Sequence, residues 1–475
     1  MDTSYFLLLT FYFICFAFIT WRYFHLGLAL LFFLLPAYLI RFPLGMIPAT
    51  MLEVMLIIIF VIFLIRGKGD KKIISHFSRP TSPASELAGG RAFLISKHHS
   101  LFLAAALFLL AATISVFTAV DIRAAAGEWK AFYIEPFLLF LVLVIALSNE
   151  QLTKDKTNYV ILPLILSGLT TAILAIYQHY TGWLVPAAFW ENGNSFRVTA
   201  WYGFPNAVGL YLAPIVPLAI YLLKQNFALK KRNGKWEMGN GLTALSLFSF
   251  LISAPLAIIF AKSSGALIGL GSGLMLLLFL WPKTRWWTAL IGLIGLIGLI
   301  SPINPARQEL LLQDRSGQIR VQMWGEAIEL LRARPVLGAG LASYQERVKP
   351  YHTTVNNEGI EIFHHPHNIF LTMYVNLGLL GLVGFLGIIV WFYKVGFQSL
   401  KPKTYSLTPV PAPHFSISSF PHFLLSSMTI ILVHGLVDSP YIKNDLAILF
   451  WVLIALMLSN APDSLPKYSA PRLRP

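Results

Sequence analysis

The densest group of titratable side chains in the sequence lies in FHHPHNIFLTMYVNLGLLGLVGFLG, residues 363–387, where three histidines, a proline and an asparagine precede a long apolar run. An imidazole, with an unperturbed pKa of about 6.5, suits the removal of a proton from a hydroxyl group at neutral pH. Two other interpretations remain open. One is a structural histidine bonded to a loop carbonyl. The other is a metal ligand, which requires His364, His365 and His367 to converge, with Glu361 as a further ligand.

The neighbouring residues predict where these histidines lie. Pro366 holds His365 in an extended conformation. Asn368 stands where the apolar run begins, and asparagine is a preferred N-cap, so His367 is expected beside the N-terminus of a helix. The segment FPNAVGLYL repeats the pattern, with Asn206 as a second expected N-cap. Two helix N-termini on one face of the protein favour the binding of an anion.

The composition is that of a membrane protein. Hydrophobic residues make up 56% of the chain, charged residues only 12%, and the mean hydropathy is +0.68, whereas about a quarter of an ordinary soluble domain is charged. We predict an all-α integral membrane protein with about 12 or 13 transmembrane helices. The predicted spans are 5–20, 23–40, 49–65, 100–120, 131–147, 159–180, 207–223, 242–260, 265–281, 287–302, 368–393, 421–438 and 443–460. Only Trp21 and Arg22 separate the first two predicted spans, so the number of transmembrane helices, 12 or 13, stays open.

The distribution of charge predicts the topology. A net charge of +15 suggests nucleic acid as a partner, but 23 of the 36 Lys and Arg residues fall in cytoplasmic loops if residues 66–99 are cytoplasmic, as the positive-inside rule requires. We therefore expect no nucleic acid, and expect the basic clusters to contact membrane lipids. The single cysteine, Cys15, excludes an internal disulfide.

We divide the chain into three parts. Residues 1–302 hold transmembrane helices 1–10, with cytoplasmic loops at 66–99 and 224–241 and an external loop at 181–206. Residues 303–367 form one long external loop. Residues 368–475 hold the last transmembrane helices and a basic cytoplasmic tail.

The long loop 303–367 favours arginine. Six of its seven basic residues are Arg, whereas Lys outnumbers Arg fifteen to eight in the predicted cytoplasmic loops. A guanidinium offers paired donors to phosphate and keeps its charge, so this loop suits a phosphate ligand. Surface ion pairs with the seven acids of the loop are the alternative.

The sequence of the loop also predicts an amphipathic helix on the bundle or in the membrane interface. Its apolar stripe would consist of Val321, Trp324, Ile328 and Leu331.

Three further ionisable residues lie in or near apolar spans. His434 and Asp438 are four residues apart on one predicted helical face, which indicates either a functional site or a mutually satisfied structural pair. Glu53 lies in the third span without a predicted partner.

The order of motifs resembles the O-antigen ligase and O-antigen polymerase family of bacterial polytopic membrane glycosyltransferases. The motifs are SFRVTAWYGFPNAVGLYL with Arg197, AKSSGALIGLGSG, RVQMWGEAIELLRARPVLGAGLASY with Arg320, and HHPHNIFLTMYVNLGLLG with His367. YIEPFLLF and HGLVDSPYIKNDLAILFW also resemble family features. Many members have Ser-Arg-Gly-Ala where this chain has Ser263, Ser264, Gly265 and Ala266. An arginine is therefore missing here, and Lys262 is a candidate substitute.

The resemblance implies an inverting transfer of a glycan from an undecaprenyl-diphosphate carrier to a glycan or lipid acceptor, without a metal or other cofactor. It places the reaction on the periplasmic face of the bacterial cytoplasmic (inner) membrane, so that the long loop is periplasmic. Carried onto this chain, it makes Arg197 and Arg320 the ligands of the diphosphate. His367 becomes the base, with His365 as a second candidate.

Other functions fit parts of the same pattern. A polysaccharide polymerase shares all the motifs named above. A transporter or flippase of lipid-linked sugars is the main alternative from a different class, although we find no internal repeat of the kind common in transporters. A non-catalytic partner in envelope assembly is a third alternative.

Overall fold

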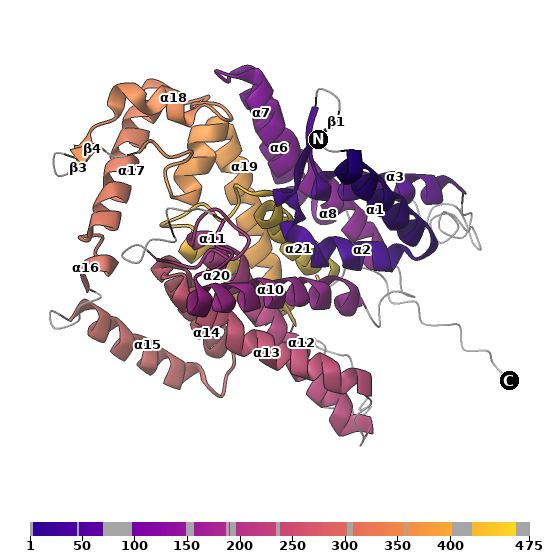
Figure 1. The fold of residues 1–475 in the computed structure, drawn as a ribbon. Helices are drawn as coiled ribbons and strands as arrows, with labels where there is room; N and C mark the ends of the chain where they lie inside the picture. The colour runs from indigo at the N-terminus through magenta and orange to yellow at the C-terminus, as the bar shows by residue number, and fades with distance from the viewer. Residues whose placement is uncertain are drawn as a thin grey trace.

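The computed structural model describes residues 3–44, 47–69, 97–148, 156–186, 190, 196–233, 238–301, 307–355, 358–359, 361–400 and 420–461 (Figure 1). Most of the predicted cytoplasmic loop at 66–99 and the basic tail after residue 461 lie outside the described residues. The described part is almost entirely helical, as an all-α integral membrane protein requires.

The first half of the chain contains α1 (Thr3–Arg22), α2 (Phe24–Phe33), η1 (Leu35–Leu39), α3 (Met51–Gly69), α6 (His99–Phe117), α7 (Ile122–Glu128), the π-helix η2 (Trp129–Ile134), α8 (Glu135–Ser148), α10 (Lys156–Thr181), α11 (Asn206–Leu212), η4 (Ala213–Ile215) and α12 (Val216–Asn233). The second half contains α13 (Met238–Phe260), α14 (Ser264–Phe279), α15 (Arg285–Ile300), α16 (Arg307–Leu310), α17 (Arg315–Ala333), α18 (Tyr344–Val348), η5 (Lys349–Tyr351), α19 (Ile369–Ser399), α20 (Phe420–His434) and α21 (Asn444–Ser459). Two antiparallel strand pairs complete the description: β1 (Arg41–Leu44) with β2 (Ile47–Thr50), and β3 (Thr354–Val355) with β4 (Glu358–Gly359).

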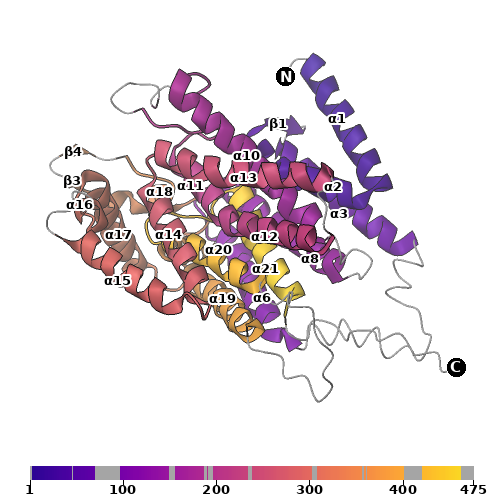
Figure 2. The ribbon, with the colours of Figure 1, turned by 90° about the horizontal axis from the view of Figure 1, so that it is seen from below.

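Helix α21 is the centre of the bundle. Every residue from Asn444 to Leu458 is buried, and the helix packs against α8, α19 and α20. A helix that is apolar on all sides is expected inside a large bundle. Figure 2 shows α20 and α21 in the middle, with α1 on one side and α15 and α17 on the other. The segment between α20 and α21 therefore lies among several helices.

The segment between α20 and α21 binds a backbone carbonyl that Pro136 leaves without a helical partner. Pro136 has no N–H, so it cannot donate to the carbonyl of Phe132, four residues earlier. The hydroxyl of Tyr441 donates to this carbonyl instead, at 2.9 Å. The indole of Trp451 in α21 donates to the same hydroxyl at 3.1 Å. This chain of hydrogen bonds ties the segment after α20 to the π-helix that precedes α8.

The outer helices expose apolar side chains. Helix α1 exposes Leu7, Leu8, Phe11, Ile14 and Phe18. Six helices are long and apolar enough to cross a membrane, and five shorter ones are also apolar, among the described residues. An exposed apolar surface of this extent indicates contact with lipid. The chain is therefore a multi-pass membrane protein.

The predicted spans coincide with helices. Each of the thirteen predicted ranges contains helical residues, and α1 ends at Arg22, where the sequence predicted a break. Helices extend into the segment predicted as a cytoplasmic loop at 224–241: α12 continues to Asn233 and α13 begins at Met238. The cytoplasmic position of this segment stays a prediction.

Glu53 has a partner that the sequence did not reveal. Its carboxylate lies 3.0 Å from the ammonium of Lys130 in the π-helix η2. It also accepts a hydrogen bond from the backbone N–H of Thr50 at 2.9 Å. A charge beside a membrane span requires such pairing, since an isolated one is costly to bury.

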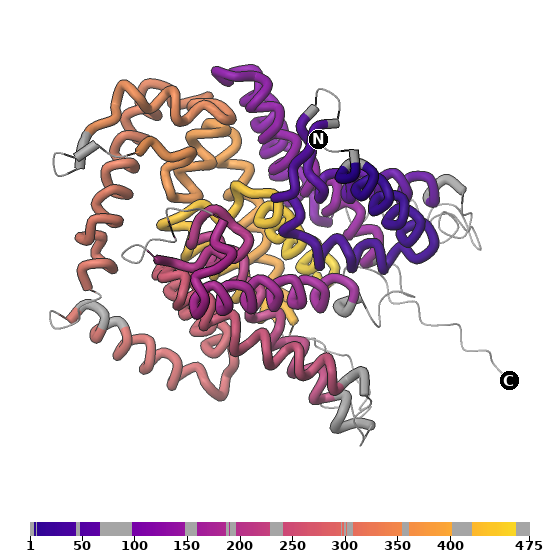
Figure 3. The backbone as a smooth tube through the Cα atoms, viewed as in Figure 1, coloured from indigo at the N-terminus to yellow at the C-terminus, as the bar shows by residue number. Residues whose placement is uncertain are grey.

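The long loop forms α16, α17, α18 and the β3–β4 pair, and runs along one side of the bundle (Figure 3). The predicted amphipathic helix is present as α17, but its predicted stripe is buried only in part. Leu331 is buried, whereas Val321 and Ile328 are exposed. The packed face also includes Met323, Ala327 and Leu330. This face forms a small core with Ala339, Tyr344, Val348 and Val375.

Two glycines lock the end of this loop onto α19. Gly378 interrupts the helix with φ 70° and ψ −172°, a conformation essentially restricted to glycine. The break frees backbone groups: Leu379 N–H donates to the carbonyl of Val336, and Ala339 N–H donates to that of Val375. Gly338, with φ 64°, faces the carbonyl of Val375, which a Cβ would meet at 2.4 Å. The loop is therefore fixed at the helix whose N-terminus carries the histidines.

We expect the Gly378→Ala variant to be less stable by about 1–3 kcal/mol, because its backbone conformation excludes a side chain and a Cβ would lie 2.2 Å from the carbonyl of Val336. Thermal unfolding in detergent measures the effect. Gly271→Ala is the matched control, since a Cβ there meets no atom within 4 Å. Equal melting of the two variants would contradict the described docking.

Candidate functional site

The site begins at the N-terminus of α19. Asn368 is its N-cap, as predicted: its side-chain oxygen accepts from the N–H groups of Phe370 and Leu371. Its amide nitrogen donates to the carbonyl of Leu436 at 2.9 Å. His367, immediately before it, has φ 47°, a left-handed conformation that is uncommon for residues other than glycine. The histidine segment is thus bound to the segment after α20, and strain of this kind occurs at functional sites.

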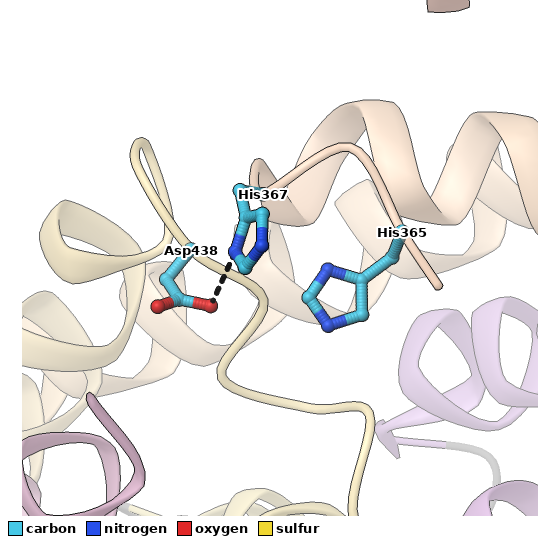
Figure 4. A group of neighbouring side chains, drawn as sticks. All are labelled: His365, His367 and Asp438. Atoms are coloured by element: carbon cyan, nitrogen blue, oxygen red, sulfur yellow. Dashed lines mark hydrogen bonds and ion pairs between the residues drawn. The ribbon is translucent and has the colours of Figure 1, made fainter. Parts of the chain in front are cut away.

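His367 is paired with Asp438. Its Nδ1 lies 3.2 Å from Oδ1 of Asp438 (Figure 4), a residue that is only 2% exposed. Burial raises the pKa of Asp438, but the neighbouring His367, with His434 and His365, outweighs burial and holds the pKa well below its usual range. An ionised carboxylate accepts hydrogen bonds but cannot donate them. In the neutral ring the proton therefore lies on Nδ1, and Nε2 carries the lone pair of a base.

Two more donors hold the Asp438 carboxylate. The backbone N–H of Ser439 donates to Oδ1 at 2.8 Å, and the side-chain amide of Asn206 donates to Oδ2 at 2.9 Å. Asn206 therefore bridges to the site rather than capping its helix. The N-cap of α11 is Pro205, and no side-chain cap bond forms there. The prediction of Asn206 as an N-cap is wrong, because a buried carboxylate and a guanidinium bind both ends of its amide.

That guanidinium belongs to Arg197. Its Nη2 donates to Oδ1 of Asn206 and to the carbonyl of Lys262, each at 2.9 Å, and its Nε donates to the carbonyl of Ala261 at 2.8 Å. Lys262, with φ 49°, supplies this carbonyl while its side chain is exposed. Burial and then the charge of Arg320 lower the pKa of Arg197, while Glu309 and Asp438 oppose the change. The two predicted arginines are thus close enough to repel each other.

Arg320 reaches the same segment from α17. Its Nε donates to the carbonyl of Val437, next to Asp438, at 2.9 Å. Its Nη1 donates to Oγ of Ser316 at 2.7 Å. The long loop and the bundle therefore bring together Arg197, Arg320 and the histidine–aspartate pair. In this arrangement the two cationic groups can bind an anion, and the oriented base can remove a proton next to it.

The second predicted base, His365, lies against His367, with ring centroids 4.8 Å apart. Burial and then the neighbouring His367 lower the pKa of His365 to about 3, so this ring is neutral at physiological pH. His364 is exposed. The convergence of three histidines considered from the sequence is replaced by a cluster of His365, His367 and Asp438.

Sequence reasoning missed the role of Asp438. The sequence placed it on one helical face with His434, as a functional site or a structural pair, but α20 ends at His434 and the Asp438 carboxylate binds His367 and Asn206. The available signal was an acidic residue at the end of an apolar span. Its partner lies 71 residues away along the chain, which local spacing does not reveal.

These features define a multi-pass helical membrane protein whose site combines an oriented histidine with two arginines. Residues 248–386 match the family model described as O-antigen ligase. Over these residues the chain is similar to the O-antigen ligase family of membrane glycan-transfer proteins. The matched residues include Lys262, Arg320, His365 and His367. No match is found among curated proteins.

We expect Arg197→Lys to lower the free energy of unfolding by about 1–3 kcal/mol, because one ammonium group cannot replace the guanidinium at three acceptors. Thermal unfolding without substrate measures this. Arg332→Ala is the control: Arg332 forms an exposed pair with Glu329, and such pairs contribute about 0–1 kcal/mol. A loss no larger than in the control would show that Arg197 does not hold the site together.

Proposed function

We propose that this protein is an O-antigen ligase-like glycosyltransferase. It would transfer a glycan from an undecaprenyl-diphosphate carrier to an acceptor hydroxyl on the periplasmic face of the bacterial inner membrane. The observation that carries the proposal is the buried Asp438 bound to Nδ1 of His367, since this pairing leaves Nε2 as a proton acceptor. The family match to residues 248–386 supports the class of reaction.

The lipid tail of the donor lies in the membrane and its diphosphate lies against Arg197 and Arg320. Nε2 of His367 takes the proton from the acceptor hydroxyl. The acceptor oxygen then forms a bond to the anomeric carbon as the bond from this carbon to the diphosphate oxygen breaks. The electron pair leaves with undecaprenyl diphosphate. One direct displacement inverts the configuration, and His367 later releases the proton to water.

The arginines stabilise the leaving group in this mechanism. Negative charge grows on the diphosphate as the bond breaks, and fixed cations stabilise such charge without reorganisation. Arg197 and Arg320 are held by carbonyl groups of the bundle, so they are already in place before the donor binds. Lys262 is a third, exposed cation at the same edge. This arrangement does the work of a metal ion at the diphosphate, and we propose a metal-independent reaction.

Asp438 has a positioning role. It is the acceptor that orients the ring of His367, and it stabilises the imidazolium that forms after proton transfer. Asn206 links this carboxylate to Arg197. Binding of a diphosphate by Arg197 is therefore connected, through one amide, to the carboxylate that orients the base.

The same site would serve a polysaccharide polymerase that uses a growing chain as its acceptor. A flippase for lipid-linked sugars, the alternative from another class, has no use for an oriented base. It would move lipid-linked glycan across a vesicle membrane without forming a bond.

We expect Asp438→Asn to lower the transfer rate by about 10²–10⁴-fold, because the amide can donate to Nδ1 and favour the wrong tautomer. His367→Gln should lower it at least as far. The assay uses purified protein, a lipid-linked oligosaccharide and an acceptor. His364→Gln is the control, because that side chain is exposed beside the site. Full activity in Asp438→Asn would remove the pair from the mechanism.

Transfer should also continue in excess EDTA, because the arginines neutralise the diphosphate. The measurement compares initial rates with and without the chelator in the same detergent. Complete loss of transfer that returns on addition of Mg²⁺ would contradict a metal-independent reaction.

A further inference from the structure

One ring nitrogen in the site lacks a hydrogen-bonding partner. Nδ1 of His365 is buried and has no hydrogen bond among the described residues. A buried polar atom without a partner is costly, so it requires an explanation such as a ligand. Figure 4 shows the ring of His365 beside His367, on the side away from Asp438. The unpartnered histidine thus belongs to the cluster that contains the base.

The cluster has the ligand types of a transition-metal site. His365, His367 and Asp438 each offer one ligand atom, and these three atoms lie within 4.8 Å of one another. Two imidazoles and one carboxylate are a common set for Zn²⁺, with water at the fourth position. Ligand bonds of about 2.0–2.2 Å require only a small closing movement of the three groups.

Two hydrogen bonds already orient the carboxylate of Asp438. Asn206 and the N–H of Ser439 both donate to Asp438, and such outer contacts hold metal-binding groups in place. The histidine segment is held as well, since Asn368 binds it to Leu436. All three ligands therefore lie on segments that are joined by hydrogen bonds.

The surrounding charges limit which ions bind and how tightly. Three cationic groups lie near the cluster. Arg197 interacts electrostatically with Asp438, and Lys443 interacts with His365. Arg320 interacts with Arg197 and with His434. Mg²⁺ and Ca²⁺ depend on several oxygen ligands, and one carboxylate among cations is a poor site for them. Bonds to imidazole nitrogen favour Zn²⁺ or Co²⁺ instead. Repulsion from the same cationic groups weakens the binding of Zn²⁺, so we expect the binding to be reversible.

We propose that His365, His367 and Asp438 form an inhibitory Zn²⁺ site. The inhibition, unlike the binding, rests on the proposed function. A Zn²⁺ ion on Nε2 of His367 would occupy the lone pair that accepts the proton. An ion on Nδ1 would displace the proton that Asp438 accepts. Either way the protein loses its base, so Zn²⁺ binding and glycan transfer exclude each other.

The binding test uses Co²⁺, which absorbs visible light strongly when its ligands are tetrahedral. The full-length protein, freed of any histidine tag, is titrated with Co²⁺ and then with Zn²⁺. We expect a visible absorption band that Zn²⁺ removes. His365→Gln and Asp438→Asn should each weaken Co²⁺ binding at least tenfold, and His364→Gln should leave it unchanged. Absence of the band, or a band that both variants retain, would overturn the site.

The inhibition test is separate. Micromolar Zn²⁺ should inhibit transfer, EDTA should reverse the inhibition, and millimolar Mg²⁺ should have no effect. His365→Gln should require at least tenfold more Zn²⁺ for the same inhibition. A protein that binds Co²⁺ through the three residues but transfers glycan at full rate with Zn²⁺ bound would keep the metal site and contradict the role of His367 as base.

Discussion

The burial of one carboxylate determines how this site is built. Asp438 is almost fully buried, and an unpaired charge in such a place is strongly unfavourable. It is compensated by His367, Asn206 and the N–H of Ser439. His367 lies just before α19, Asn206 begins α11, and Ser439 lies in the segment after α20. Satisfying one charge therefore brings these three segments together, and Asn206 in turn binds Arg197.

The second arginine depends on close contact between backbones. Arg320 is carried by α17, whose packed face rests on a small core that includes Val375 of α19. The chain after α17 reaches the break in α19 at Gly378, where the backbones exchange hydrogen bonds. A helix break inside a membrane protein requires such replacement partners. The long loop is in this way part of the bundle, and its arginine has a fixed place.

Sequence reasoning recovered the features that depend on neighbours along the chain. The helical spans follow from apolar runs, and Asn368 caps α19 through bonds to residues two and three positions later. Contacts between distant residues were not recovered. Nothing near Asn206 indicates that Arg197 and Asp438 bind its amide. Part of the predicted stripe of α17 is exposed, because apolar residues in a membrane protein also occupy outward surfaces, so periodicity alone does not identify the packed face.

The central claim is that a diphosphate binds between Arg197 and Arg320, beside the base held by Asp438. The most direct measurement is an electron cryo-microscopy structure of the protein in lipid nanodiscs with undecaprenyl diphosphate. The account predicts phosphate density in contact with both guanidinium groups, and His367 bound to Asp438 next to it. Density for the diphosphate away from these arginines, or His367 separated from Asp438 in the complex, would contradict it.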